Sequence, residues 1–143
     1  MLKKFFMMIL AASALGACDT PAVTPPMQPA PPQAPVSYMA FFELGSVKLS
    51  DQSLQTISQA AQVYKTKANA RVQVTGYADT VGSPAMNVQL SQRRANAVKD
   101  GLVKAGVPAA AITTGGDGET GLLVNTGDQA NEPRNRRVAI VIQ

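Results

Sequence analysis

The sequence of 143 residues contains no histidine, no tryptophan and one cysteine, Cys18. Without histidine, and with a single thiol, the chain cannot assemble the usual zinc sites or the Ser-His and Cys-His pairs of nucleophilic enzymes. One cysteine also excludes an internal disulfide. Aromatic residues make up only 5% of the chain, so few of them accompany the arginines for stacking on bases. We therefore expect no enzyme, no cofactor or metal, and no binding of nucleic acid.

The first residues are arranged like a secretory signal peptide. Lys3 and Lys4 precede an apolar segment from Phe5 to Leu15, which is shorter than the ~20 residues that cross a bilayer. We expect a signal peptide over residues 1–17, with a plain hydrophobic tail as the alternative. Its removal would take two positive charges from the formal net charge of +4 and leave a mildly basic chain.

The residues before Cys18 resemble a bacterial lipobox, in which Leu15, Gly16 and Ala17 lead to a cysteine. The resemblance implies that Cys18 becomes a lipidated N-terminus that carries a diacylglyceryl group and an N-acyl chain such as palmitate. Each buried CH₂ contributes ~0.8 kcal/mol, so several acyl chains anchor a protein to a membrane effectively permanently. Lipidation would also account for the lone thiol.

Seven of the ten prolines lie between Asp19 and Val36. Prolines at this density do not support a helix interior or a central strand. This segment of 18 residues reaches roughly 55 Å at ~3.1 Å per residue, and with Cys18 it forms the predicted linker over residues 18–36. We interpret it as a spacer between membrane and domain, and docking to an aromatic groove of a partner is the alternative.

Residues 37–143 are predicted to form a single domain. The order of elements predicts an α/β (α+β) two-layer sandwich, β-α-β-α-β(β), with both helices on one face of a mixed sheet. Residues 109–113 are either a helical turn or the start of a third strand, and a long loop follows over 114–133. The other predicted elements are a strand at Ser37–Leu44, a helix from Ser50 or Asp51 to about Lys67 that buries Leu54, Ile57, Ala61 and Tyr64, a strand at Arg71–Tyr77, a helix at Met86–Ala105 ended by Gly106, and a strand at Arg137–Ile142.

A charged residue is predicted on the inner face of the second helix. At ~100° per residue, Arg94 and Asn87 fall in the same sector as Leu90 and Val98. Because burying an unpaired charge is costly, Arg94 needs an anion, and Asp79 in the preceding loop is the nearest candidate. Either the two form a structural ion pair, or they hold the two ends of a zwitterion, with the ammonium on Asp79 and the carboxylate on the guanidinium fork.

Several spaced motifs in the domain agree, in order, with one known family. They are Gly76-Tyr77-Ala78-Asp79, Gly82, Asn87, Leu90-Ser91, Arg94-Ala95, Val98 and the closing Asn135-Arg136-Arg137-Val138. On these residues, about Ser37–Gln143 resembles the OmpA-like peptidoglycan-binding domain, a family that includes the peptidoglycan-associated lipoproteins. The chain departs from the pattern at Tyr77 and Ala78, where the family usually has a small polar residue or histidine and then threonine.

The resemblance implies a function and a set of site residues. Asp79 and Arg94 would hold the free ends of meso-diaminopimelate in peptidoglycan, with Thr80, Asn87, Leu90, Phe42 and Glu43 around the ligand and with Asn135 and Arg136 as structural support. Asn87 is equally suited to capping its own helix. A scaffold that binds other envelope proteins through a degenerate pocket is the alternative. The family favours the outer membrane, facing the periplasm, whereas Asp19 resembles an inner-membrane retention signal.

Overall fold

The computed structural model describes residues 33–143, so the expectations for the signal peptide, Cys18, Asp19 and most of the linker lie outside it. The predicted α/β (α+β) order is confirmed, and residues 109–113 contain both a helical turn and the start of a strand. In chain order the elements are β1 (Val36–Phe41), α1 (Asp51–Thr66), β2 (Val72–Gly76), α2 (Pro84–Lys104), the 3₁₀ helix η1 (Ala109–Ala111), β3 (Ile112–Gly116), the 3₁₀ helix η2 (Pro133–Asn135) and β4 (Arg137–Ile142).

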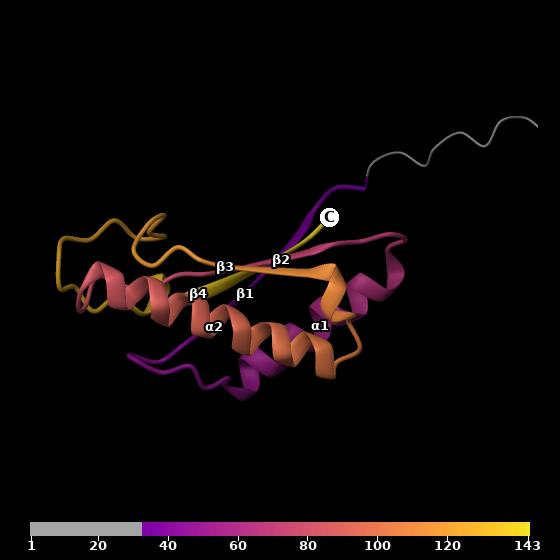
Figure 1. The fold of residues 1–143 in the computed structure, drawn as a ribbon, viewed down its shortest axis with the longest axis horizontal. Coiled ribbons are helices and arrows are strands. Elements are labelled where there is room, and N and C mark those ends of the chain that lie inside the picture. The colour runs from indigo at the N-terminus through magenta and orange to yellow at the C-terminus, as the bar shows by residue number, and fades with distance from the viewer. Residues whose placement is uncertain (1–32) are drawn as a thin grey trace, which may run out of the picture. The chain divides into compact units, whose positions relative to one another are not determined.

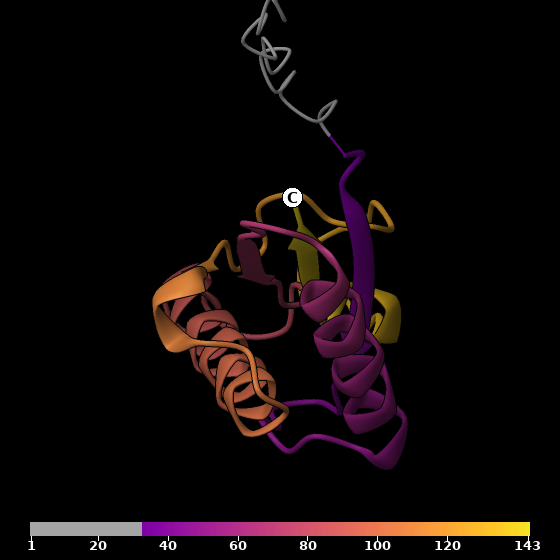
Figure 2. The same ribbon diagram turned by 90° about the vertical axis from the view of Figure 1, so that its right-hand side faces the viewer.

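The four strands form one mixed sheet in the order β1-β4-β2-β3. β4 pairs antiparallel with both β1 and β2, whereas β2 and β3, which α2 connects, run parallel. Both helices cover the same face of the sheet, with α1 over β1 and α2 over β2 and β3 (Figures 1 and 2). The mixed sheet with its helices on one face is as predicted.

The core lies between the sheet and the helices. Alternate strand residues such as Val72, Val74 and Ile140 are buried against it, which explains the period-2 patterns in β2 and β4. The expected burial of Leu54 is wrong, because its side chain is 47% exposed. The inner face of α1 begins instead at Ser53, one residue earlier, whose hydroxyl donates to the carbonyl of Phe41 at 3.1 Å.

Serine hydroxyls cap both helices. Ser50 Oγ accepts from the N–H of Ser53 at the start of α1, and Ser83 Oγ accepts from the N–H of Met86 at the start of α2. Pro84 occupies the first turn of α2, where its missing N–H costs nothing. The helix therefore begins two residues before the predicted start at Met86.

Two glycines let α2 approach the sheet closely. A Cβ on Gly76 would lie 2.0 Å from the carbonyl oxygen of Ser91, and one on Gly116 would lie 2.4 Å from the N–H nitrogen of Gln92. These strand ends meet at one edge of the sheet, because Gly76 is in register with both Gly116 and Val138. The segments after β1, β2 and β3 therefore converge with the segment before β4 beside the start of α2.

Candidate ligand-binding site

Arg94 lies near the middle of α2 and is fully buried, with 0% exposure. Its guanidinium donates three hydrogen bonds to main-chain carbonyls, from Nε to Ser46 (2.9 Å), from Nη2 to Glu43 (3.0 Å) and from Nη1 to Tyr77 (3.2 Å). The guanidinium carbon lies 5.3 Å from the centroid of the Phe42 ring. Arg94 thus ties the segments that follow β1 and β2 to α2.

The charge of Arg94 has no carboxylate in direct contact among residues 33–143, so the direct ion pair with Asp79 is not formed. A guanidinium has five N–H groups, and the three carbonyls use three of them, which leaves two for another acceptor. Burial lowers the pKa of Arg94 to about 10, partly opposed by the nearby charge of Asp79. Arg94 is therefore protonated at neutral pH.

Asp79 follows β2 and is paired with a different arginine. Its Oδ2 atom accepts a hydrogen bond from Nη1 of Arg136 at 3.0 Å, and both side chains are buried. Its Oδ1 atom accepts only a long hydrogen bond, of 3.4 Å, from the N–H of Val81. One carboxylate oxygen is thus committed to Arg136, while the other keeps acceptor capacity.

Arg136 and Asn135 connect the segments around this carboxylate. Arg136 also donates from Nε to the carbonyl of Phe42 at 3.1 Å and from Nη1 to the side-chain oxygen of Asn131. Asn135 exchanges two hydrogen bonds of 2.8 Å with the main chain of Val124. These contacts suit residues that support the loops, which is the role that the resemblance implies for them.

Asn87 is buried in the first turns of α2 and does not cap the helix, since Ser83 does. Its Nδ2 group lies within hydrogen-bond distance of the carbonyls of Asp79 (3.2 Å) and Val81 (3.0 Å) and of the Glu119 carboxylate (2.7 Å). Two N–H groups serve three acceptors there. Asn87 therefore holds the loop that carries Asp79 in place.

Thr80 is buried but turned toward the long β3–β4 loop. Its hydroxyl donates to the carbonyl of Gly127 at 2.7 Å and accepts from the N–H of Ala130 at 3.0 Å. In this position Thr80 fixes the loop, and it does not line the cavity that Asp79 faces.

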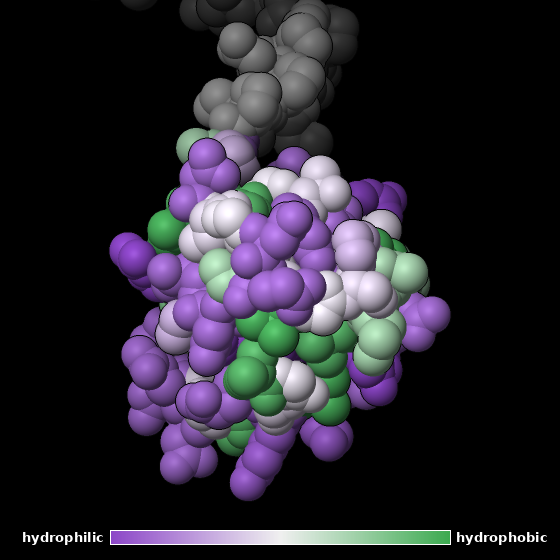
Figure 3. Space-filling model, turned by 90° about the vertical axis from the view of Figure 1, so that its left-hand side faces the viewer, coloured by the Kyte–Doolittle hydropathy of each residue, from purple (hydrophilic) through white to green (hydrophobic). Residues whose placement is uncertain are grey.

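A cavity of about 270 Å³, which we name the α2 cavity, lies between the segment after β1 and the start of α2. Three of the expected site residues, Asp79, Asn87 and Leu90, line it. Figure 3 shows this end of the domain, where hydrophobic surface gathers in the middle and hydrophilic side chains surround it. The other lining residues are Leu44, Gly45, Val81, Gly82, Met86 and Arg93.

Arg94 does not line the α2 cavity, but it lies directly behind one wall. Leu44 and Gly45 form that wall, and the carbonyls of the residues on either side of them, Glu43 and Ser46, accept from Arg94. The four-residue segment from Glu43 to Ser46 therefore separates the cavity from the guanidinium of Arg94.

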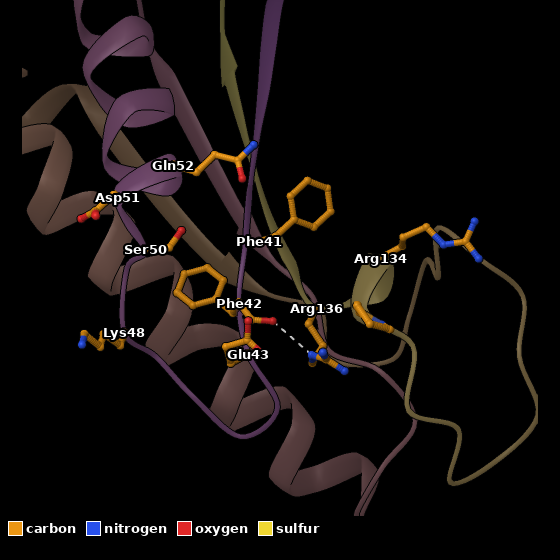
Figure 4. A pocket seen from close by; sticks show the side chains of 10 residues that line it. Phe41, Phe42, Glu43, Lys48, Ser50, Asp51, Gln52, Arg134 and Arg136 are labelled. Carbon is orange, nitrogen blue, oxygen red and sulfur yellow. Dashed lines mark hydrogen bonds between the residues drawn. The ribbon is translucent and has the colours of Figure 1, made fainter.

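Three further expected residues border a second cavity, of about 770 Å³, which we name the β1–α1 cavity. Phe42, Glu43 and Arg136 line it, and Figure 4 shows Arg136 close to the main chain of Phe42, to which it donates. Because Arg136 also bonds Asp79 in the α2 cavity, its guanidinium lies between the two cavities.

The sequence predicted a supporting role for Arg136 but not its ion pair with Asp79, although the Asn-Arg-Arg run before the last strand was the available signal. It also did not foresee where Tyr77 points. The guanidinium carbon of Arg137 lies 4.0 Å from the centroid of the Tyr77 ring, and Tyr77 does not line the α2 cavity.

The described residues, 33–143, contain no cluster of three or more Cys, Asp or Glu side chains able to hold a metal ion. Neither α1 nor α2 combines the length and apolar character that crossing a membrane requires.

The fold and the charged cavity define a small α/β domain suited to binding a polar ligand at one edge of its sheet. A model of the OmpA family matches residues 41–136, and the chain belongs to that family. The peptidoglycan-associated lipoprotein from Burkholderia pseudomallei has a crystal structure that superposes with a TM-score of 0.68 at 28% identity, over 73% of this chain and 89% of that one.

Two of the relatives that match in sequence illustrate the similarity. An outer membrane protein of Gluconacetobacter diazotrophicus is 37% identical over 112 residues, which are 74% of this chain and 30% of that protein. The peptidoglycan-binding protein ArfA of Mycobacterium tuberculosis is 35% identical over 88 residues, which are 62% of this chain and 27% of ArfA. The chain thus spans less than a third of the length of these two relatives. Their names, and that of the Burkholderia lipoprotein, describe envelope and binding proteins.

Proposed function

We propose that the protein binds peptidoglycan non-covalently, through the meso-diaminopimelate of the stem peptide, without catalysing a reaction. One observation carries the proposal: buried Arg94 keeps two N–H groups and has no carboxylate partner among residues 33–143, beside a cavity that Asp79 lines. The names of ArfA and of the Burkholderia lipoprotein support it.

The free end of meso-diaminopimelate carries one ammonium and one carboxylate. In our proposal the ammonium binds Oδ1 of Asp79, the oxygen that Arg136 does not use. The carboxylate reaches the unused N–H groups of Arg94 once the Leu44–Gly45 wall moves aside. Asn87 and Leu90 complete the lining, Phe42 and Glu43 hold the wall, and the Thr80 contacts position the loop.

A binding assay with matched peptides tests this proposal. The full chain, in mild detergent, is titrated with a stem tetrapeptide that contains meso-diaminopimelate and with the same peptide containing lysine, which lacks the second carboxylate. We expect binding of the first peptide only, and we expect Asp79→Asn to lose it while retaining the side-chain shape. Arg71→Gln, a charge change at an exposed residue at the far end of β2, is the matched control. Equal affinity for the two peptides would refute the proposal that the site recognises the zwitterionic end of meso-diaminopimelate.

A protein-binding scaffold is the second candidate. Two observations favour it. Asp79 already has Arg136 as its partner, and Arg94 does not line the α2 cavity, so the two residues are not open together to a zwitterionic ligand in this conformation. Failure of the wild type to bind either peptide, together with failure to sediment with cell-wall sacculi, would support the scaffold.

We further propose that lipidated Cys18 anchors the chain in the outer membrane and that residues 19–36 let the domain reach the cell wall from the periplasmic side. The proposal rests on the lipobox-like residues before Cys18 and on the proline content of the linker. Mass spectrometry of the membrane fraction should find acyl chains, palmitate among them, on Cys18. Cys18→Ser should release the protein from the membrane, and a sucrose gradient would reveal whether Asp19 instead keeps it in the inner membrane.

A further inference from the structure

Arg93 is an exposed side chain on α2 with no hydrogen-bond or ion-pair partner among residues 33–143. It stands beside Arg94 in the sequence, but its side chain leaves the helix on the outer side. It lines the α2 cavity together with Asp79 and Asn87. It also borders a second hollow, on the outer face of α2, whose other lining residues are Val88, Gln89 and Gln92.

Two carboxylates, those of Asp79 and Glu119, lie at or beside the α2 cavity, and neither is paired with Arg93. Arg93, Arg94 and Arg136 are close enough to act on one another, since the charges of Arg136 and Arg93 lower the pKa of Arg94 in addition to the larger effect of burial. The carboxylate of Asp79 pairs with only one of them, Arg136. A zwitterionic ligand end that is held by Asp79 and Arg94, as proposed above, leaves the charge of Arg93 without an anion.

We propose that Arg93 is a specificity residue that binds a second carboxylate of the stem peptide, outside the zwitterionic end of the diamino acid. The inference rests on the proposed function, because it assumes that the zwitterionic end of the diamino acid occupies the α2 cavity. A ligand seated there and continuing along the surface of α2 passes Arg93 before it reaches the outer hollow with Gln89 and Gln92.

Two carboxylates of a stem tetrapeptide lie close enough to the diamino acid to reach Arg93. One is the α-carboxylate of the D-isoglutamyl residue before it, and the other belongs to the terminal D-alanine after it. Both present the same chemistry to a guanidinium, which prefers planar, two-oxygen acceptors. Exposed ion pairs contribute modestly, so we expect the carboxylate to improve affinity roughly two- to fivefold.

The experiment combines ligand and protein changes. The full chain is titrated by calorimetry with three tetrapeptides that share the same diaminopimelate: the free acid, the D-isoglutamine α-amide and the terminal D-alaninamide. We expect one of the two amides to bind the wild type two- to fivefold more weakly than the free acid. In Arg93→Gln that difference should vanish. The free acid and the weaker-binding amide should then both bind the variant with the affinity that this amide has for the wild type. Arg71→Gln should keep the wild-type difference.

Each other outcome overturns the proposal in a distinguishable way. Equal affinity of the wild type for all three tetrapeptides removes the role of Arg93 but leaves diaminopimelate binding in place. A loss of affinity in Arg93→Gln that is the same for acid and amides shows that Arg93 does not read a carboxylate. If the wild type binds none of the three, the proposed function fails, and this inference fails with it.

Discussion

Nη1 of Arg136 lies 3.0 Å from Oδ2 of Asp79, with both side chains almost completely buried. Removing one partner of a buried ion pair leaves the other charge without compensation, which typically costs about 3–5 kcal/mol. We therefore expect Arg136→Ala to lower the free energy of unfolding by about that amount in urea titrations. Arg134→Ala is the control, because its ion pair with Glu132 is exposed to solvent and its loss should change stability little. Similar urea midpoints for the two variants would contradict the conclusion that the buried Asp79–Arg136 pair stabilises the fold.

Arg94 should not tolerate replacement by lysine. A single ammonium cannot reproduce a planar fork that bonds the carbonyls of Glu43, Ser46 and Tyr77 and keeps two donors for a ligand. We expect Arg94→Lys to lower the free energy of unfolding by about 1–3 kcal/mol and to reduce sedimentation with sacculi at least tenfold. Circular dichroism at the assay temperature must show folded protein for the binding result to count. Wild-type sedimentation by the folded variant would eliminate Arg94 as the carboxylate receptor.

Peptidoglycan binding should be insensitive to pH near neutrality. The chain has no histidine, and the pKa of Arg94, although lowered by burial, is about 10. Arg94 is thus charged throughout pH 6.0–8.5, and we expect the dissociation constant for the stem tetrapeptide to stay within about twofold over that range. A steep change there would indicate that another group controls binding.

The same lowered pKa has a consequence for stability at high pH. Because the folded protein releases the Arg94 proton more readily than the unfolded chain, the burial penalty applies below about pH 10 and is relieved above it. The contribution of Arg94 alone therefore makes stability rise with pH above 10. Urea midpoints of the wild type, compared over this range with those of Arg94→Met, which has no titrating group at this position, would show the difference.

Gly76 is expected to be far less replaceable than Gly115, although both lie at strand ends. A Cβ on Gly76 would lie 2.0 Å from the carbonyl oxygen of Ser91, whereas a Cβ on Gly115 meets nothing within 4 Å. Gly76→Ala should force α2 away from β2 and destabilise the domain by about 3 kcal/mol or more. Thermal unfolding followed by circular dichroism gives the comparison, and equal melting temperatures for the two alanine variants would be inconsistent with this packing.

Tyr77, where the chain departs from its family's pattern, should matter for stability and not for binding. Its ring stacks on Arg137, away from the α2 cavity. We expect Tyr77→Ala to lower the free energy of unfolding by about 1–2 kcal/mol through the lost cation–π contact, with an unchanged dissociation constant for the tetrapeptide. A clear loss of affinity in this variant would mean that the ring reaches the ligand.

Much of the fold follows from local patterns in the sequence. The alternating residues of β2 and the spacing along α2 predicted which faces are buried, because strands and helices repeat with periods of 2 and 3.6 residues. The same spacing placed Arg94 and Asn87 inside, as the structure has them. Leu54 was misassigned because α1 buries small residues, Ser53, Ala60 and Ala61, which carry a weak hydrophobic signal.

The sequence alone therefore determined that an arginine would be buried in α2 and that an aspartate would follow β2. Only the tertiary structure decided their partners. Arg136 reaches Asp79 across 57 residues because β4 inserts between β1 and β2, and no local pattern specifies that strand order. Hydrogen bonds between side chains form between groups that the folded chain brings within about 3 Å, whatever their separation in sequence. For that reason the partners of Asp79 and Arg94 emerged only from the assembled sheet.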